Sequence, residues 1–165
     1  MKIAIISDSH DNLANLNKAI KNIEAEGIKT IIHCGDIASL ETLKELSRIF
    51  KEKVLIAFGN MDEDYLKNMG SDLKKFPKFK FFGQVGEVRM GKKKIAFTHF
   101  PAIAKKLAAS QDYDIVFYGH THKPWEETIG KTRLVNPGNL AGLLYRATFA
   151  IYDTKNDELK LKFVI

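Results

Sequence analysis

Residues 1–7 read MKIAIIS, residues 30–34 read TIIHC and residues 54–58 read VLIAF. Each run is short, apolar and rich in β-branched side chains, which is typical of a strand buried on both faces of a sheet. Between these runs, apolar residues recur at helical spacing over residues 13–23 and again over residues 40–49. The order strand, helix, strand, helix, strand predicts parallel strands joined by right-handed crossovers.

The rest of the chain is richer in strands. One helix is expected within residues 101–110, and Gly83, Gly86 and Gly91 mark turns. Strand-like runs lie at residues 79–82, 87–90, 94–98, 115–118, 133–135, 147–152 and 159–164. A parallel first half followed by a β-rich second half predicts an α/β fold with two stacked sheets and helices outside. We expect one domain, residues 1–165, because this length fits a single hydrophobic core.

The composition indicates a globular protein and does not identify a partner. Apolar residues make up 45% of the chain and charged residues 28%, which excludes a mostly disordered chain. The single cysteine, Cys34, excludes an internal disulfide framework and any zinc site with several thiolates. No apolar run approaches the roughly 20 residues that span a bilayer, and the N-terminus lacks the pattern of a signal peptide. We therefore expect a soluble cytoplasmic protein with no membrane partner.

Polar side chains follow the predicted strands within a few residues of their carboxyl ends, where open α/β sheets bind ligands. The residues are Asp8, His10, Asp36, Asn60, His99, His120 and His122. Taken singly, the aspartates fit helix caps or turns, and each histidine fits a solvated loop. Turn chemistry does not explain why four of the five histidines gather at strand ends. The set as a whole therefore predicts a functional site.

This set suits a centre with two metal ions. Imidazole and carboxylate ligands favour transition metals, whereas Mg²⁺ and Ca²⁺ prefer all-oxygen shells. Two cations about 3.5–4 Å apart need a shared carboxylate to offset their repulsion. Asp8 and His10 would point to one face if strand geometry continued through Ser9, and His120 and His122 would do the same.

Five short blocks make the pattern specific. They are Ser7-Asp8-Ser9-His10, Gly35-Asp36, Gly59-Asn60, Thr98-His99 and Gly119-His120-Thr121-His122. In this order and spacing they resemble the five blocks of the calcineurin-like metallophosphoesterase superfamily. Asn136-Pro137-Gly138-Asn139 resembles a turn that follows the last block in the small bacterial and archaeal phosphodiesterase branch.

The resemblance implies a fold, an activity and a set of ligands. The fold is a four-layer α-β-β-α sandwich, and the activity is hydrolysis of a small phosphodiester by two divalent metal ions. One ion would be held by Asp8, His10, Asp36 and His122, and the other by Asp36, Asn60, His99 and His120. Asp36 would bridge the ions and act in catalysis with a metal-bound hydroxide, Asn60 and His99. Mn²⁺ or Ni²⁺ is favoured, and Fe, Co and Zn also suit these ligands.

Met61 departs from the pattern of many superfamily members, which place a proton-donating histidine after Gly-Asn. Methionine cannot donate a proton. The small-phosphodiesterase branch also lacks that histidine, so the departure fits this branch. We expect hydroxide to attack phosphorus in line and activated leaving groups to be cleaved far better than alkyl ones.

Three further residues are expected near the site rather than in it. Asp11 and Asn12 either cap the first helix or support His10, and His33 is a packed residue or a support for the ligands. Two other functions remain as alternatives. A catalytically silent scaffold of this fold would have no reason to keep all seven ligand positions. A nuclease or nucleic-acid-binding protein would use the net charge of +6, but the basic residues are dispersed.

Overall fold

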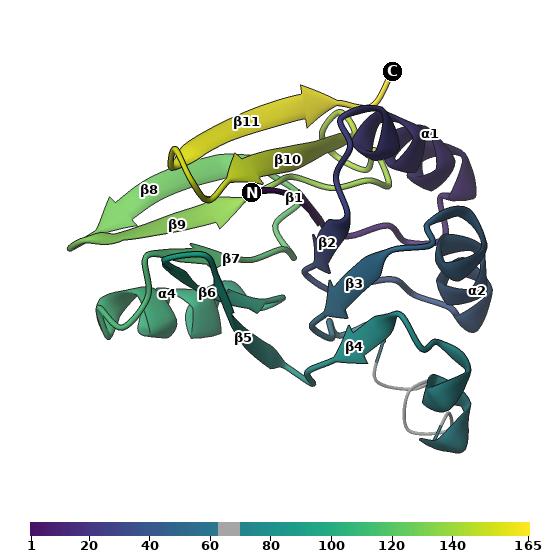
Figure 1. Ribbon diagram of the computed structural model, residues 1–165, viewed down its shortest axis with the longest axis horizontal. Helices are drawn as coiled ribbons and strands as arrows, with labels where there is room; N and C mark the ends of the chain where they lie inside the picture. The colour runs from purple at the N-terminus through teal and green to yellow at the C-terminus, as the bar shows by residue number, and fades with distance from the viewer. Residues whose placement is uncertain (63–69) are drawn as a thin grey trace.

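The computed structural model describes residues 1–62 and 70–165, which form an α/β fold (Figure 1). The strands of this part of the chain form two sheets that pack face to face. Ile3 and Ile5 from one sheet meet Phe97 and Phe117 from the other in the core between them. The predicted pair of stacked sheets is thus confirmed.

The first sheet has a parallel centre and an antiparallel flank. Its strands are β1 (Lys2–Ile6), β2 (Thr30–His33), β3 (Lys53–Ile56), β4 (Phe79–Phe81), β10 (Thr148–Asp153) and β11 (Glu158–Phe163). Their order is β11-β10-β1-β2-β3-β4. β1 to β4 pair in parallel, whereas β10 runs antiparallel to β1 and to β11. The parallel centre places the carboxyl ends of β1, β2 and β3 at one edge.

The second sheet adds two more carboxyl ends to that edge of the molecule. Its strands are β5 (Val85–Met90), β6 (Lys93–Thr98), β7 (Ile115–Phe117), β8 (Trp125–Ile129) and β9 (Thr132–Asn136). Their order is β5-β6-β7-β9-β8, and β6, β7 and β9 are mutually parallel. The loops after β6 and β7 therefore leave the sheet on the same side.

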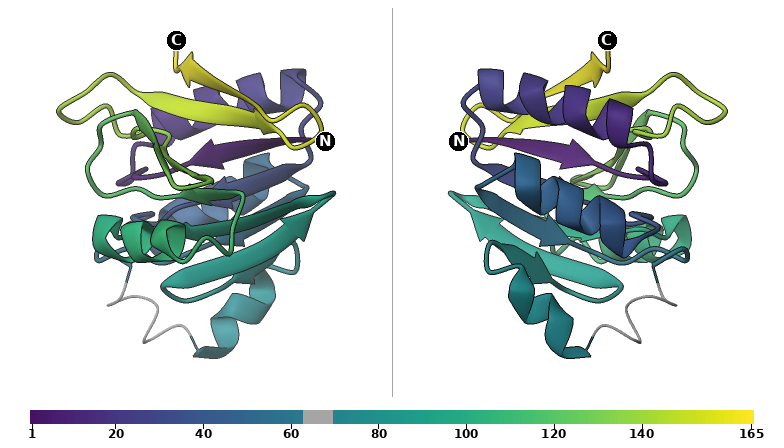
Figure 2. Two further views of the ribbon diagram at one scale, coloured as in Figure 1. Left: turned by 90° about the vertical axis from the view of Figure 1, so that its left-hand side faces the viewer. Right: turned by 90° about the vertical axis from the view of Figure 1, so that its right-hand side faces the viewer.

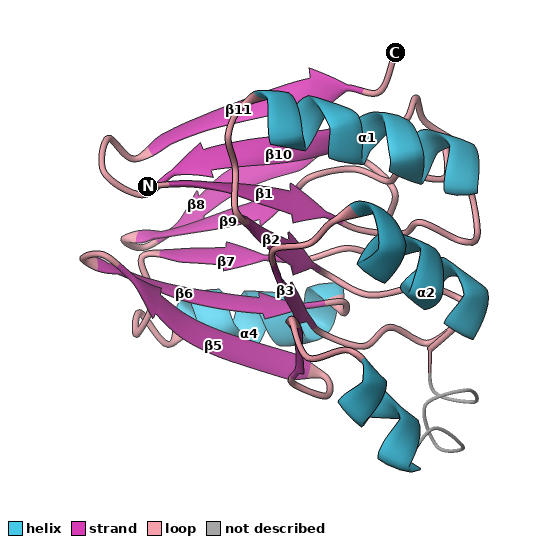
Figure 3. Cartoon of the chain, turned by 45° about the vertical axis from the view of Figure 1, so that its right-hand side comes forward, coloured by secondary structure: helices cyan, strands magenta, loops and turns pink. Residues whose placement is uncertain are grey.

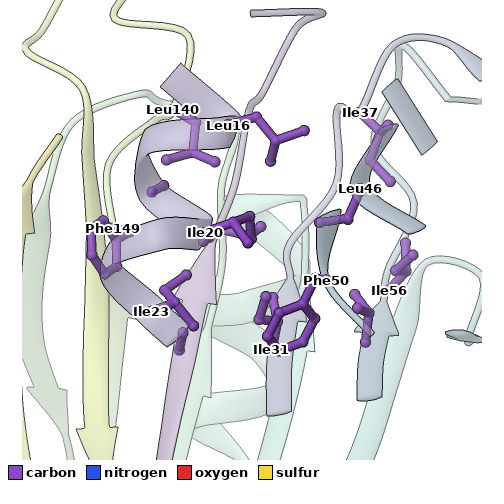
Figure 4. Close-up of a cluster of buried hydrophobic side chains, with 14 of the residues drawn as sticks. Leu16, Ile20, Ile23, Ile31, Ile37, Leu46, Phe50, Ile56, Leu140 and Phe149 are labelled. Carbon is purple, nitrogen blue, oxygen red and sulfur yellow. The ribbon is translucent and has the colours of Figure 1, made fainter. Parts of the chain in front are cut away.

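Helices cover both outer faces of the sandwich and complete the four layers (Figures 2 and 3). They are α1 (Leu13–Ala25), α2 (Leu40–Ile49) and α4 (Pro101–Ala109), with a short 3-10 helix, η1 (Gly70–Lys75). α1 and α2 pack on the first sheet, where Leu16 and Ile20 meet Ile31 and Phe149 (Figure 4). α4 packs on the second sheet. No helix in the described ranges is long and apolar enough to traverse a bilayer.

The division of the chain between the sheets differs from the expectation. The second half does not form a sheet of its own, because β4, β10 and β11 all join the first sheet. β8 is a strand that the sequence does not predict. Its residues, Trp125–Ile129, are mostly exposed and include two glutamates, so they lack an apolar run. Antiparallel hydrogen bonding to β9 holds this segment as a strand instead.

Candidate metal centre

The polar strand-end side chains converge at one end of the sandwich. In a first group, His122 Nε2 lies 3.3 Å from Asp8 Oδ1 and 3.1 Å from His10 Nε2. His10 Nε2 also lies 3.6 Å from Asp36 Oδ2. These side chains come from the segments that follow β1, β2 and β7. The donor atoms of Asp8, His10 and His122 are close enough to one another to hold one cation.

A second group of donors adjoins the first. His99 Nε2 lies 3.4 Å from Asp36 Oδ2 and 3.1 Å from His120 Nδ1. His120 Nδ1 lies 3.2 Å from Asn60 Oδ1. Asp36 Oδ2 therefore faces both groups, since His10 and His99 approach it from either side. All seven side chains expected at this site are brought together.

The backbone that presents these side chains does not follow strand alternation, and that expectation is wrong. β1 ends before Asp8 and His10, and β7 ends before His120 and His122. Asp8 and His10 have φ angles of 52° and 39°, and His120 and His122 have φ angles of 72° and 60°. Asp36, with φ 55°, is also left-handed. Residues held in this sparsely populated region cluster at functional sites, where surrounding contacts fix them.

Close backbone approach between the loops requires glycine at two of the motif positions. A Cβ atom on Gly59 would overlap the carboxylate of Asp36, and one on Gly119 would overlap Ser7 Oγ. The loops are also joined directly, because the Asp8 N–H donates to Gly35 O at 2.9 Å. The glycines of these blocks therefore let the loops that carry Asp8, Asp36 and His120 lie against each other.

Asp62 joins two loops of the site through backbone hydrogen bonds, and the sequence analysis did not single it out. This buried carboxylate accepts hydrogen bonds from the backbone N–H groups of Gly59, Asp36, Ile37 and Ala38, at 2.8–3.1 Å. It therefore joins the turn after β2 to the turn after β3. An acidic residue two positions after Gly59-Asn60 is the only sequence signal for this role.

Backbone partners fix the orientation of two side chains at the centre, Asp36 and His99. The Met61 N–H donates to Asp36 Oδ1 at 2.9 Å, which leaves Oδ2 facing the two donor groups. His99 is fully buried, and its Nδ1 lies 2.9 Å from Cys34 O. Only a protonated Nδ1 can donate to a carbonyl, so in the neutral ring Nε2 carries the lone pair, and this atom faces Asp36 Oδ2.

His33 is a buried, neutral histidine that contacts the loops carrying the candidate ligand residues. Burial lowers the pKa of His33 to about 4. Its Nδ1 accepts from the Gly35 N–H at 3.2 Å, so Nε2–H donates to Ser9 Oγ at 3.2 Å. Ser9 Oγ in turn lies 3.5 Å from Asp36 O. His33 thereby connects the loop after β1 to the loop after β2.

Asp11 and Asn12 tie the first loop to its surroundings in different ways. Asn12 caps α1, since its Oδ1 accepts from the Asn15 N–H at 3.0 Å. Asp11 Oδ1 accepts from Ser39 Oγ and Thr42 Oγ1, both at 2.6 Å, at the start of α2. Asn12 therefore caps the first helix as one expectation had it, whereas Asp11 joins the loop to the second helix.

The segment Asn136 to Asn139 supports the loop that carries His120 and His122. Asn136 Nδ2 donates to Gly119 O at 2.9 Å, and Asn139 Nδ2 donates to His122 O at 3.1 Å. The sequence marked this segment only as a resemblance and gave it no role. Its two asparagines fix the backbone on either side of the histidine pair.

The electrostatics of the site suit a bound cation. Burial opposes ionisation of Asp8, but the nearby imidazoles of His10 and His122 outweigh it and hold the Asp8 pKa below its usual value. The Asp8 carboxylate in turn raises the pKa of His122, whereas burial raises the pKa of Asp36. Two pairs of imidazole nitrogens face each other at 3.1 Å, and each pair needs a proton or a cation between its lone pairs. Imidazole, carboxylate and amide donors without a thiolate fit Mn, Fe, Co, Ni and Zn.

Known proteins resemble this chain in sequence and in fold. The chain is 33% identical over 163 residues to a phosphodiesterase from Methanocaldococcus jannaschii, with 97% of both chains covered. It is 28% identical to a probable metallophosphoesterase from Bacillus subtilis, over 99% of this chain and 90% of that one. A solved structure of an archaeal phosphodiesterase matches with a TM-score of 0.88 and 31% identity, covering 99% of each chain.

The family model of the calcineurin-like phosphoesterase superfamily domain matches residues 1–157, a span that contains all five motif blocks. The four-layer fold and the gathered histidines, aspartates and asparagine agree with that match. The chain belongs to the calcineurin-like phosphoesterase superfamily.

Proposed function

We propose that the protein is a phosphoric diester hydrolase that depends on two divalent transition-metal ions. The observation that carries the proposal is the position of Asp36 Oδ2, which lies 3.6 Å from His10 Nε2 and 3.4 Å from His99 Nε2. One oxygen that faces two groups of donors is what a pair of neighbouring cations requires. The relative from Methanocaldococcus jannaschii, which is named a phosphodiesterase, supports a diester as the substrate.

The donors divide into two ligand sets that share Asp36. The first set is Asp8, His10, Asp36 and His122, and the second is Asp36, Asn60, His99 and His120. We favour Mn²⁺ or Ni²⁺, and Fe, Co and Zn also suit these mixed nitrogen and oxygen donors, which include no thiolate. When bound, the ions would lower the pKa of a water molecule and neutralise charge on the phosphoryl oxygens.

The side chains contribute fixed geometry at this centre. Asp36 is held by the Met61 N–H, and His99 by its bond to Cys34 O, so neither needs to reorient when substrate arrives. Asn60 and His120 are exposed at the mouth of the site, whereas Asp8 and His99 are buried. Substrate would therefore approach from the side of Asn60 and His120.

Met61 sets a limit on the leaving group. Its side chain is 50% exposed beside Asp36, and its thioether cannot donate a proton. A leaving alcohol would then depart as an anion or take its proton from water. Esters with acidic leaving groups, such as nitrophenol, should be hydrolysed far faster than dialkyl esters.

The proposal is tested by metal reconstitution. Protein stripped of metal is loaded with Mn²⁺, Ni²⁺, Zn²⁺ or Mg²⁺ and assayed with bis(p-nitrophenyl) phosphate, p-nitrophenyl phosphate and a dialkyl phosphate. We expect hydrolysis of the aryl diester with a transition metal and little hydrolysis by the stripped protein. Asp36→Asn and His99→Ala should lose this activity, whereas Glu41→Gln, an exposed carboxylate on α2, should keep it.

Two results would contradict the proposal. Full activity in both Asp36→Asn and His99→Ala would show that the ligand assignment is wrong. No hydrolysis with any metal, together with salt-dependent retention of DNA by the stripped protein, would favour a nucleic-acid-binding role. Equal rates for aryl and alkyl diesters would contradict the account of the leaving group alone.

A further inference from the structure

The loop of residues 142–146 presents apolar side chains to solvent on a strained turn. Tyr145 N donates to Leu143 O at 2.7 Å across a single residue, and that residue, Leu144, has φ 64°. This is a γ-turn with a left-handed central residue, a rare and strained form. Leu143, Leu144 and Tyr145 are 51%, 89% and 43% exposed.

Stability does not explain leucine at this position. Glycine or asparagine adopts a left-handed backbone more readily than leucine, and asparagine is also better solvated. An exposed apolar cluster is unfavourable in water unless something covers it. Strain and exposure together therefore indicate that Leu143 and Leu144 meet a binding partner.

The loop is attached directly to the first group of metal-facing donors. The Ala141 N–H donates to Asp8 O at 3.0 Å, and Asn139 Oδ1 accepts from the N–H groups of Gly142 and Leu143 at 2.6 and 3.0 Å. The same Asn139 side chain donates to His122 O at 3.1 Å. Figure 2 shows this loop, before β10, projecting on the side toward which β1 points.

Other apolar side chains border the second group of donors. The Phe100 ring lies 5.2 Å from the His99 ring and 6.2 Å from the His120 ring, measured between centroids. The half-exposed Met61 follows Asn60. Apolar residues are thus joined through the backbone to the first group of donors and lie beside the second, which fits a substrate with an organic group on each side of its phosphate.

We propose that Leu143, Leu144 and Tyr145 form a binding surface for a large apolar or aromatic alcohol group of a phosphodiester. The inference rests on the proposed diesterase function and adds the class of substrate. The phosphate would sit against the polar donors, while one of its two ester groups packs on the loop beside His122. A rigid turn suits this role, because its apolar side chains are already in place before substrate binds.

The experiment keeps the leaving group constant and varies the other ester group. Metal-loaded protein is assayed with phenyl p-nitrophenyl phosphate and with methyl p-nitrophenyl phosphate, and the ratio of the two kcat/KM values is recorded. We expect the wild type to prefer the phenyl ester. Leu144→Asn and Leu143→Ser, singly and together, should lower the ratio, the double variant by roughly tenfold.

A matched control is available on the far edge of the first sheet. Leu161 on β11 is 44% exposed, and Leu161→Ser should leave the ratio unchanged. Leu144→Asn should also unfold at the same temperature as the wild type or higher, since asparagine tolerates the left-handed turn. A structural role for the leucine would lower that temperature instead.

Each contrary outcome has a distinct meaning. If both esters are cleaved and the ratio is the same in wild type and variants, the inference is wrong and the diesterase function stands. If the wild type cleaves neither ester with any metal, the proposed function fails and this inference fails with it. If sedimentation shows a wild-type dimer that the double variant dissociates without a change in the ratio, the loop is a contact between copies of the chain.

Discussion

The two groups of donors at the candidate metal centre differ in charge and in exposure. The first contains two carboxylates, Asp8 and Asp36, whereas the second shares Asp36 and otherwise offers imidazole and amide donors, with Asp8 within reach of Asp36 and His99. His10 and His122 are partly buried, but Asn60 and His120 are exposed. A divalent cation is attracted more strongly to the group with more negative charge and less water. The first position should therefore bind metal tightly, and the second should bind it weakly and exchange it.

Replacing the shared carboxylate should have the largest effect, because it weakens both positions at once. Asp36→Asn keeps the shape of the side chain but removes the charge that both groups use. We expect kcat/KM for an aryl diester to fall on the order of 10³-fold, equivalent to a few kcal/mol of lost charge stabilisation. Steady-state kinetics with excess metal measures this, and Asp8→Asn is the comparison, since Asp8 is assigned as a ligand of the first position alone. A smaller effect in Asp36→Asn than in Asp8→Asn would show that Asp36 is not shared.

Replacing Asp62 should weaken metal binding at both positions, although Asp62 belongs to neither group of donors. Its carboxylate accepts backbone N–H groups from the loops that carry Asp36 and Asn60. The amide of Asp62→Asn would set an N–H group against these donors, so we expect metal affinity to fall about 10- to 100-fold. Calorimetric metal titration measures the change, and circular dichroism shows whether the variant is folded. Asp11→Asn, whose carboxylate bonds to Ser39 and Thr42, serves as the matched control. Equal affinity in the two variants would contradict this role for Asp62.

The smallest expected effect is the difference in affinity between the first and the second metal-binding step. One unit of charge about 4 Å from a divalent cation interacts with it by about 2 kcal/mol even in water, so the second step should be at least about tenfold weaker. Calorimetry of the stripped protein should resolve two steps, and Asn60→Ala should abolish the weaker one alone. One step of doubled stoichiometry, unchanged by Asn60→Ala, would mean that the positions are equivalent.

The sequence predicts where the site lies better than how it is built. Strand runs that precede Asp8 and Asp36 predict that these two side chains meet, because parallel strands of one sheet share an edge. His99 follows a strand of the other sheet, so its approach depends on how the two sheets stack. The left-handed turns at Asp8 and His10 cannot be predicted from the sequence, because tertiary hydrogen bonds impose them against the local backbone preference. The apolar pattern of a strand also does not show which of the two sheets the strand joins.

Asp62 and Asn139 show why support residues are harder to predict than ligands. Each acts through backbone groups of loops distant in the sequence, so residue type and spacing carry little information about its partners. β8 is missed for a related reason. Its hydrogen bonds to β9 depend on the folded sheet and not on an apolar pattern of its own.

The central strand of the first sheet has its partners at opposite ends of the chain. β1 pairs with β2 on one side and with β10 on the other, in a register that sets Lys2 opposite Asp153. The Leu140 N–H also donates to Ser7 O, next to Asp8. A nascent polypeptide must therefore extend through Leu140 and β10 before the turn bearing Asp8 is pinned. High-affinity metal capture should consequently follow the synthesis of β10, and it does not provide a nucleus around which the earlier strands assemble.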